Sequence, residues 1–132
     1  MLQSNTNLNW NMIVKMFDAR FAPLVKAGTK KQTVRPLPKE MPQAGDAISL
    51  RMWEKSPDGM NQVILRTSTV SKVEFIDIAQ TGWCWVSDLS LKYLSVADAF
   101  AQADGFTNWA EMRDWIKETY GFPFSGIVIH WD

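Results

Sequence analysis

The stretch AGTKKQTVRP, residues 27–36, marks the point where a short helix gives way to a strand. Pro23 suits the first turn of a helix, because its missing N–H would have no partner there, and Gly28 suits the left-handed residue just past a helix end. We therefore expect a helix over residues 23–27. A strand over residues 32–35 follows, and it stops at the proline that ends the stretch, since proline cannot donate to a sheet ladder.

Side chains alternate between the two faces of a strand, which sorts the polar residues of this stretch. Thr33 and Arg35 share one face, whereas Gln32 and Val34 share the other. Lys30 precedes the strand and can reach the face of Thr33 and Arg35 from the turn. The sequence thus predicts that Lys30, Thr33 and Arg35 act together.

The chain outside this stretch predicts more strands before residue 80. A run of strand formers occupies residues 12–17. The turn sequence SPDG, residues 56–59, should pair a strand over residues 47–53 with one or two strands over residues 62–77. A final strand is expected over residues 127–131.

Helices dominate the expected structure between residues 95 and 121. One helix is predicted over residues 96–103, and a second over residues 109–120, where Thr107 or Asn108 can cap the first turn. Asn108 with Glu111 three residues later resembles a capping box. Because the helices are grouped and do not alternate with strands, we expect an α+β fold or a small barrel with appended helices.

The length and composition of the chain exclude several classes of protein. The 132 residues suffice for one domain, and no apolar run is long enough to cross a membrane. Cys84 and His130 are the only cysteine and the only histidine, so disulfide frameworks and Cys/His zinc sites are excluded. We expect one soluble, cytoplasmic domain over residues 12–132 with no cofactor and no metal, preceded by a polar extension, residues 1–11.

Charge is unevenly distributed in a chain whose formal net charge is zero. Six basic residues and no acidic residue fall within residues 19–39, whereas acidic residues outnumber basic ones by seven to three within residues 86–132. A basic run of this kind is usually a solvated loop. It also suits an anionic ligand such as the backbone of RNA.

At residues 28–35 the sequence resembles the ASCH family, small domains related to the PUA fold with the signature G-x-K-x-x-E-x-R. Gly28, Lys30 and Arg35 match at their spacing, and Thr33 stands at the acidic position. The similarity extends over about residues 12–131, through features that occur in the same order along the chain. These include the segments Asp104-Gly105-Phe106, Trp109, Phe124-x-Gly126 and Trp131.

The resemblance implies a small PUA-like β-barrel of about five or six mostly antiparallel strands with flanking helices, and RNA or a modified nucleoside as ligand. One branch, the bacterial N(4)-acetylcytidine amidohydrolases, has Lys and Thr at the positions of Lys30 and Thr33, with a Glu on a later strand. That Glu would fall within residues 63–67, but this chain has no acid between Asp58 and Glu74. The candidates to replace it are Glu54, Glu74 and Asp77.

Three hypotheses follow. The preferred one is binding of RNA or a modified nucleoside in a basic cleft, with Trp53 or Trp83 stacking a base. The expected ligand-binding residues are Arg20, Gly28, Lys30, Lys31, Gln32, Thr33, Arg35 and Trp53. The alternative is a hydrolase of N(4)-acylated cytidine or of RNA, with Lys30 as general base or phosphate-polarising group and Thr33 as nucleophile or water-orienting group. The third is a solvated loop without a ligand.

Overall fold

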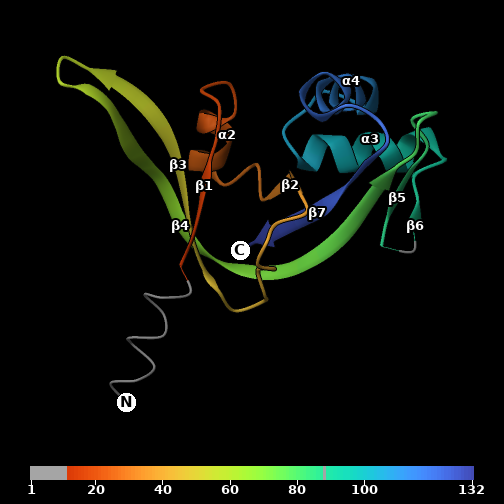
Figure 1. Cartoon of the computed structure of the whole chain (residues 1–132), viewed down its shortest axis with the longest axis horizontal. Coiled ribbons are helices and arrows are strands. Elements are labelled where there is room, and N and C mark those ends of the chain that lie inside the picture. Colours follow the sequence, from red (N-terminus) through yellow and green to blue (C-terminus); the bar gives the residue numbers. More distant parts are fainter. Residues whose placement is uncertain (1–11, 88) are drawn as a thin grey trace.

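The computed structural model describes residues 12–87 and 89–132. Its fold is α+β, as predicted (Figure 1). The expected N-terminal extension lies outside these residues. The elements in chain order are β1 (Ile13–Met16), α2 (Ala22–Ala27), β2 (Gln32–Pro36), β3 (Ala47–Ser56), β4 (Gly59–Ile78), β5 (Cys84–Val86), β6 (Leu89–Ser90), α3 (Leu94–Ala103), α4 (Trp109–Tyr120) and β7 (Phe124–Trp131). None of the helices in this part of the chain is long and apolar enough to cross a membrane.

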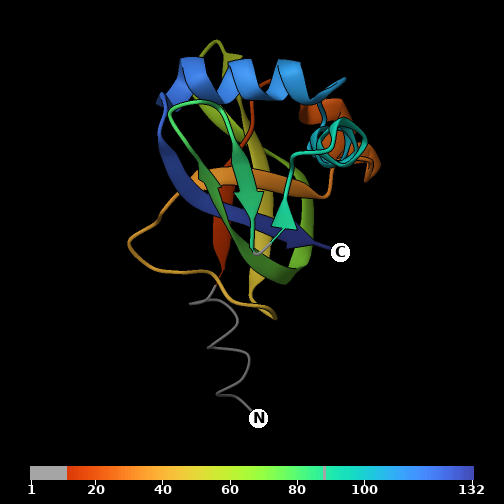
Figure 2. The ribbon, with the colours of Figure 1, turned by 90° about the vertical axis from the view of Figure 1, so that its right-hand side faces the viewer.

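The strands form one mostly antiparallel sheet around the long, bent strand β4 (Figure 1). The first half of β4 pairs with β3, and its second half pairs with β7 and β5. At one end of the sheet β2 pairs with β7, and at another β1 pairs with β3 in the single parallel pairing among the described strands. The sheet curls (Figure 2), but it does not close into a barrel, because β1 and β2 share no backbone ladder in the described residues.

Local signals account for most element boundaries. The chain turns from β3 to β4 with Ser56 opposite Gly59, which confirms the predicted hairpin. Helix α2 ends at Gly28, whose φ of 81° is the left-handed conformation expected there. Helix α3 starts before the predicted residue 96, because Tyr93 is its N-cap and the Tyr93 carbonyl accepts hydrogen bonds from the amides of Val96 and Ala97.

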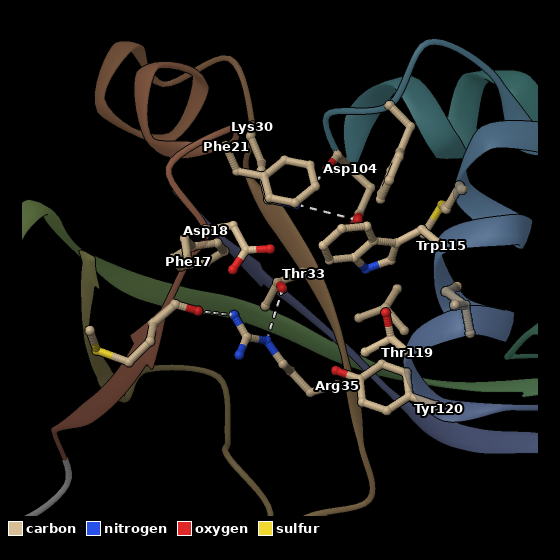
Figure 3. A pocket seen from close by; sticks show the side chains of 15 residues that line it. Phe17, Asp18, Phe21, Lys30, Thr33, Arg35, Asp104, Trp115, Thr119 and Tyr120 are labelled. Atoms are coloured by element: carbon tan, nitrogen blue, oxygen red, sulfur yellow. Dashed lines mark hydrogen bonds and ion pairs between the residues drawn. The ribbon is translucent and has the colours of Figure 1, made fainter. Parts of the chain in front are cut away.

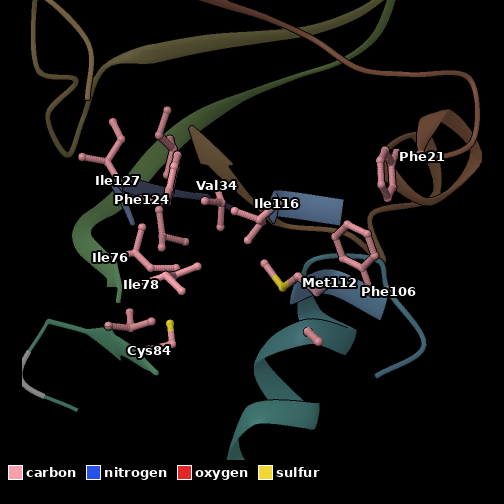
Figure 4. Close-up of a cluster of buried hydrophobic side chains, with 14 of the residues drawn as sticks. Phe21, Val34, Ile76, Ile78, Cys84, Phe106, Met112, Ile116, Phe124 and Ile127 are labelled. Atoms are coloured by element: carbon pink, nitrogen blue, oxygen red, sulfur yellow. The ribbon is translucent and has the colours of Figure 1, made fainter. Parts of the chain in front are cut away.

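Helix α4 covers one face of the curled sheet and closes the core that Figure 4 shows. Its buried residues Met112 and Ile116 pack in the same cluster as Val34 of β2 and Ile76 of β4. Burying side chains of this size contributes about 1.5–3 kcal/mol each, so this contact fixes α4 against β2. Cys84 lies in the same cluster, and burial raises the pKa of its thiol to about 12, which makes it a poor nucleophile.

Candidate functional site

A pocket of about 280 Å³ lies where β2, the chain after β1, and α4 meet (Figure 3). We call it the Arg35 pocket. Its aromatic lining consists of Phe17, Phe21, Phe106, Trp115 and Tyr120. Its polar lining consists of Asp18, Lys30, Thr33, Arg35, Asp104 and Thr119. Apolar walls around a few convergent polar groups are typical of small-ligand sites, and the volume is near the lower end of their range of roughly 300–1,000 Å³.

The stretch between α2 and β2 brings three predicted residues into this pocket. The left-handed Gly28 reverses the chain after α2, and the Leu24 carbonyl accepts hydrogen bonds from the amides of both Thr29 and Lys30. Strand β2 then pairs with β7. As a result Lys30, Thr33 and Arg35 all line the pocket, and the predicted convergence of these side chains is observed.

Lys30 is almost fully buried and is paired with Asp104, a residue of the α3–α4 connection. Its Nζ lies 3.3 Å from Asp104 Oδ2 and also donates to the Asp104 carbonyl. Asp104 Oδ1 accepts a second hydrogen bond, from Gln32 Nε2 at 3.2 Å. Only 2% of Lys30 and 4% of Asp104 are exposed. This network joins β2 to the helical layer, and it occupies polar groups that would otherwise be free for a ligand.

Burial moves the pKa values of this pair toward their neutral forms. Burial lowers the pKa of Lys30, with the positive charges of Arg35 and Arg20 acting in the same direction and Asp104 opposing them. Burial raises the pKa of the Asp104 carboxyl to about 6, although Lys30, Gln32 and Arg35 all favour the carboxylate. Lys30 is therefore more easily deprotonated than a solvated lysine.

Arg35 and Thr33 form the second polar group of the pocket. Arg35 Nε donates to Thr33 Oγ1 at 3.0 Å, and Nη2 donates to the carbonyl of Met16 at 2.7 Å. The guanidinium also lies over the ring of Phe17, 5.0 Å from its centroid. Within the described residues Nη1 has no hydrogen-bond partner, and the carboxylate of Asp18 lies nearby in the same cavity (Figure 3). The guanidinium of Arg35, which donates, and the carboxylate of Asp18, which accepts, thus line the same pocket.

The other predicted binding residues lie outside the pocket lining. Arg20 lies against the aromatic wall, with its guanidinium 4.8 Å from the Phe21 ring centroid, and it pairs with Glu111 at 3.2 Å. Gln32 is buried against Asp104, and Lys31 is exposed. The remaining two are Gly28, which adjoins Arg66, and Trp53, on the β3–β4 hairpin.

The lining of the Arg35 pocket is balanced in charge, whereas the sequence predicted a basic cleft. Its charged lining consists of two cations, Lys30 and Arg35, and two carboxylates, Asp18 and Asp104. The remaining basic side chains of residues 19–39 do not line the pocket, since they fall on α2, on turns or on the exposed chain after β2. A charge count along the sequence could not reveal this, because it does not show toward which part of the fold each side chain points.

The carboxylate candidates from the sequence also lie elsewhere. Glu54 is exposed on the β3–β4 hairpin. Glu74 contacts His130 Nε2 at 2.8 Å and accepts from Ser87 at 3.1 Å, and Asp77 accepts from Ser125 at 2.7 Å. None of these three acids lines the pocket.

Sequence reasoning missed Asp18 and three side chains of α4 that line the pocket. Asp18 comes two residues after β1, and Trp115, Thr119 and Tyr120 come from the end of α4. The spacing of Trp115 and Thr119, four residues apart, puts them on one helix face and was the available signal. What the sequence could not show is that this face opens toward β2.

Comparisons with known proteins identify no ligand and no activity for this pocket. No protein-family model, no curated protein and no solved structure matches this chain. Within residues 12–87 and 89–132, no group of three or more His, Cys, Asp or Glu side chains is placed to hold a metal ion. The side chains with polar groups that line the pocket are Asp18, Lys30, Thr33, Arg35, Asp104, Thr119 and Tyr120.

Proposed function

We propose that the chain binds a nucleoside, free or within RNA, in the Arg35 pocket. The observation that carries this proposal is the convergence of Arg35, Thr33 and Asp18 in one cavity with aromatic walls. A nucleobase has a flat apolar face and an edge with donors and acceptors. Trp115 and Tyr120 offer apolar contact to the face, Arg35 Nη1 can donate to the edge, and the Asp18 carboxylate can accept from it.

Binding by shape and hydrogen bonds fits this pocket better than binding by charge alone. Its cations and carboxylates balance in number, and Lys30 already pairs with Asp104. In this proposal Lys30 holds the wall of the pocket in place and does not contact a phosphate. A neutral base or nucleoside is thus a better occupant than a polyphosphate.

We further propose that the chain is an ASCH-like domain with a nearly closed PUA-like barrel. The strand order β1-β3-β4, continued through β7 to β2, puts β1 and β2 at the two ends of a curled sheet (Figure 2). The hydrogen bond from Arg35 on β2 to the carbonyl of Met16 on β1 spans that gap. The match of Gly28, Lys30 and Arg35 to the family signature supports the same assignment.

Calorimetric titration with cytidine, N(4)-acetylcytidine and a mixed-sequence RNA tests the binding proposal. Asp18→Asn removes the charge of an exposed side chain and replaces one of its two acceptor oxygens with an NH2 donor. It should weaken binding about tenfold or more, since a hydrogen bond to a charged group is worth about 1.5–3 kcal/mol. Asp114→Asn, an exposed acid of α4 outside the pocket, is the matched control and should bind normally. Equal affinity of the two variants, or no binding by the wild type, would contradict the proposal.

Hydrolysis of an N(4)-acylated cytidine or of RNA is the second candidate. The buried Lys30, with its lowered pKa, favours it, because a lysine can act as a general base only when its amine is readily deprotonated. Thr33 Oγ1 accepts from Arg35 Nε, so the hydroxyl hydrogen remains free to be abstracted. Asp18 and Asp104 are the carboxylates available in the pocket.

Turnover assays separate the two candidates. The protein is incubated with N(4)-acetylcytidine and, separately, with mixed-sequence RNA, alongside Lys30→Ala and Thr33→Val. Thr33→Val keeps the shape of a buried side chain but removes the acceptor of Arg35 Nε, so thermal unfolding is measured for this variant as well. A loss of turnover in a variant that remains folded reports chemistry. Turnover that disappears in both variants would establish the enzyme, whereas binding without product would leave only the binding function.

A further inference from the structure

The outer half of the β3–β4 hairpin presents a distinctive surface away from the pocket. Arg51, Trp53 and Lys55 alternate along β3, opposite Ile64, Gln62 and Met60 of β4. Alternating positions and their cross-strand partners point to one side of a ribbon, so these six side chains share a face. We call it the ribbon face. In Figure 1 the hairpin projects from the sheet on the side opposite α3 and α4.

Large apolar side chains on the ribbon face are unusually exposed. The exposed fraction is 52% for Trp53, 56% for Met60 and 56% for Ile64. Single exposed apolar residues are ordinary, but three on one side of a two-stranded ribbon form a patch of the kind that marks an interaction site. The fold itself gives no reason for this patch, because the hairpin would pair equally well with polar residues there.

The charges on the ribbon face are all positive. Arg51 and Lys55 lie on it, and none of its six positions is acidic. Arg51 is held in place, since its Nε donates to Ser49 Oγ at 2.8 Å and its Nη1 donates to Gln62 Oε1 at 2.7 Å. An aromatic ring flanked by two cations on the same strand is therefore available to a ligand with flat groups and negative charge.

We propose that the ribbon face binds a single strand of nucleic acid, with Trp53 stacking a base and Arg51 and Lys55 contacting phosphates. Base stacking on aromatic side chains beside cations is how single strands are held without sequence preference. A bilayer is a poorer occupant, because the hairpin tip carries the turn SPDG with the acidic Asp58 and the apolar residues lie along the side. The acid-free face likewise selects an anionic partner over an ordinary protein surface.

This surface is independent of the Arg35 pocket, because it shares no residue with the pocket lining. The two proposals can therefore fail separately. A variant of the ribbon face should change the affinity for an RNA strand and leave the affinity for a free nucleoside unchanged. A variant of the pocket such as Asp18→Asn should weaken binding of the free nucleoside.

Fluorescence anisotropy with a labelled mixed-sequence RNA oligonucleotide tests the ribbon face. Trp53→Ala should weaken binding on the order of 5- to 150-fold, the range reported by alanine substitution of stacking aromatics, and Trp53→Phe should retain most of the affinity. Phe75→Ala is the matched control, since Phe75 is also an exposed aromatic residue but lies in the second half of β4, opposite Ile127 and away from the hairpin. Thermal unfolding of each variant should be unchanged, because all three substitutions are at exposed positions.

The salt dependence of binding provides a second readout. Lys55→Gln should reduce the slope of log affinity against log salt by about 0.7, the value expected for one lost contact to a single strand. Lys117→Gln, an exposed lysine on α4, should leave the slope unchanged. Equal RNA affinity of Trp53→Ala and wild type would overturn the proposal. So would a sedimentation result in which Trp53→Ala abolishes self-association while RNA binding is unaffected, because the ribbon face would then be a contact between two copies of this chain.

Discussion

The ion pair between Lys30 and Asp104 connects the strand that carries the site to the helical layer. The side chains of Lys30 and Asp104 are 2% and 6% exposed, and the pair is completed by hydrogen bonds from Lys30 to the Asp104 carbonyl and from Gln32 to the carboxylate. A buried pair of this kind adds little net stability over a well-packed apolar pair, but removing one partner leaves an uncompensated charge. Its main effect here is to fix the position of the pocket wall.

Replacing only Lys30 should therefore be costly. We expect Lys30→Met to lower the free energy of unfolding by about 3–5 kcal/mol, because Asp104 then remains buried without its cation. Chemical denaturation measures this change. Lys31→Met, at the exposed neighbouring position, should stay within about 0.5 kcal/mol of wild type. A loss of less than 1 kcal/mol in Lys30→Met would mean that the pair does not hold the wall.

The raised pKa of Asp104 predicts an unusual pH dependence of stability. Burial raises this pKa from 3.8 to about 6, so the folded state binds more protons than the unfolded state between these values. Asp104 therefore contributes to the free energy of unfolding below about pH 4, and this contribution is lost as the pH rises through about 6. The two-unit shift corresponds to on the order of 2–3 kcal/mol.

Comparison with Asp104→Asn isolates this effect from the other carboxyl groups. The free energy of unfolding of the wild type minus that of Asp104→Asn should decrease as the pH rises from 4 to 7. Glu74, whose pKa is lowered, contributes the opposite slope, but it does so equally in both proteins and cancels. A difference that rises with pH would show that Lys30 keeps Asp104 ionised in the folded state.

Single residues show both the strength and the limit of sequence reasoning. The signature spacing singled out Lys30 over Lys31, and only Lys30 is buried and lines the pocket. The sequence could not reveal that Lys30 pairs with Asp104, because 74 residues separate them and no local pattern couples them. Nor could the sequence show that Glu54, Glu74 and Asp77 lie outside the pocket lining, since burial and side-chain direction depend on the whole fold.

Among the elements, the turn from α2 to β2 positions the site most directly. Gly28 ends α2 with a φ of 81°, and a Cβ added there would lie 3.0 Å from Arg66 Nη1. That atom is the end of a flexible side chain that donates to the Lys26 carbonyl at 3.3 Å, so it can move aside. The main cost of a side chain at this position is therefore backbone strain.

We expect Gly28→Ala to lower the free energy of unfolding by about 1–2 kcal/mol, the cost of the left-handed conformation for a residue with a Cβ. Gly45→Ala is the control, because Gly45 also has a positive φ but a Cβ there would meet nothing within 4 Å. Similar losses in both variants would show that strain alone acts. A much larger loss in Gly28→Ala would mean that Arg66 cannot move and has a structural role in this turn.

Elements with strong local signals were predictable, and those that depend on distant partners were not. The β3–β4 hairpin, α2 and α4 follow from a turn sequence, a proline–glycine pair and a capping residue. Strand β7 begins at Phe124, three residues before the prediction, because Phe124 and Ser125 pair with Ile78 and Asp77 of β4. That pairing is decided by the bend of β4, which no local pattern encodes.

Across the whole molecule, the Arg35 pocket lies beside two ends of the curled sheet that no backbone ladder joins in the described residues. Strands β1 and β2 lie at these ends, and helix α4 spans the space beside them. The predicted α+β class required only the grouping of elements along the chain. The curl of the sheet requires long-range pairing of β4 with both β3 and β7, which explains why the composition of the pocket could be predicted only on the β2 side.

Arg35 provides the only described side-chain hydrogen bond between β1 and β2, through Nη2 and the Met16 carbonyl. If this contact holds the open ends of the sheet together, Arg35→Lys should free β1 while leaving the charge in place. We expect amide hydrogen exchange in β1 to accelerate about tenfold or more, in line with a charged hydrogen bond worth about 1.5–3 kcal/mol. Exchange in the paired strands β4 and β7 should change little, because their ladder is untouched.

Arg66→Lys is the matched control, since Arg66 donates to the Lys26 carbonyl and contacts neither end of the sheet gap. Its β1 amides should exchange at the wild-type rate. Acceleration spread evenly over β1, β4 and β7 in Arg35→Lys would indicate global destabilisation and would contradict a local closing role. Unchanged exchange in β1 would mean that the parallel ladder with β3 alone holds this strand, and that the sheet stays curled without the Arg35 contact.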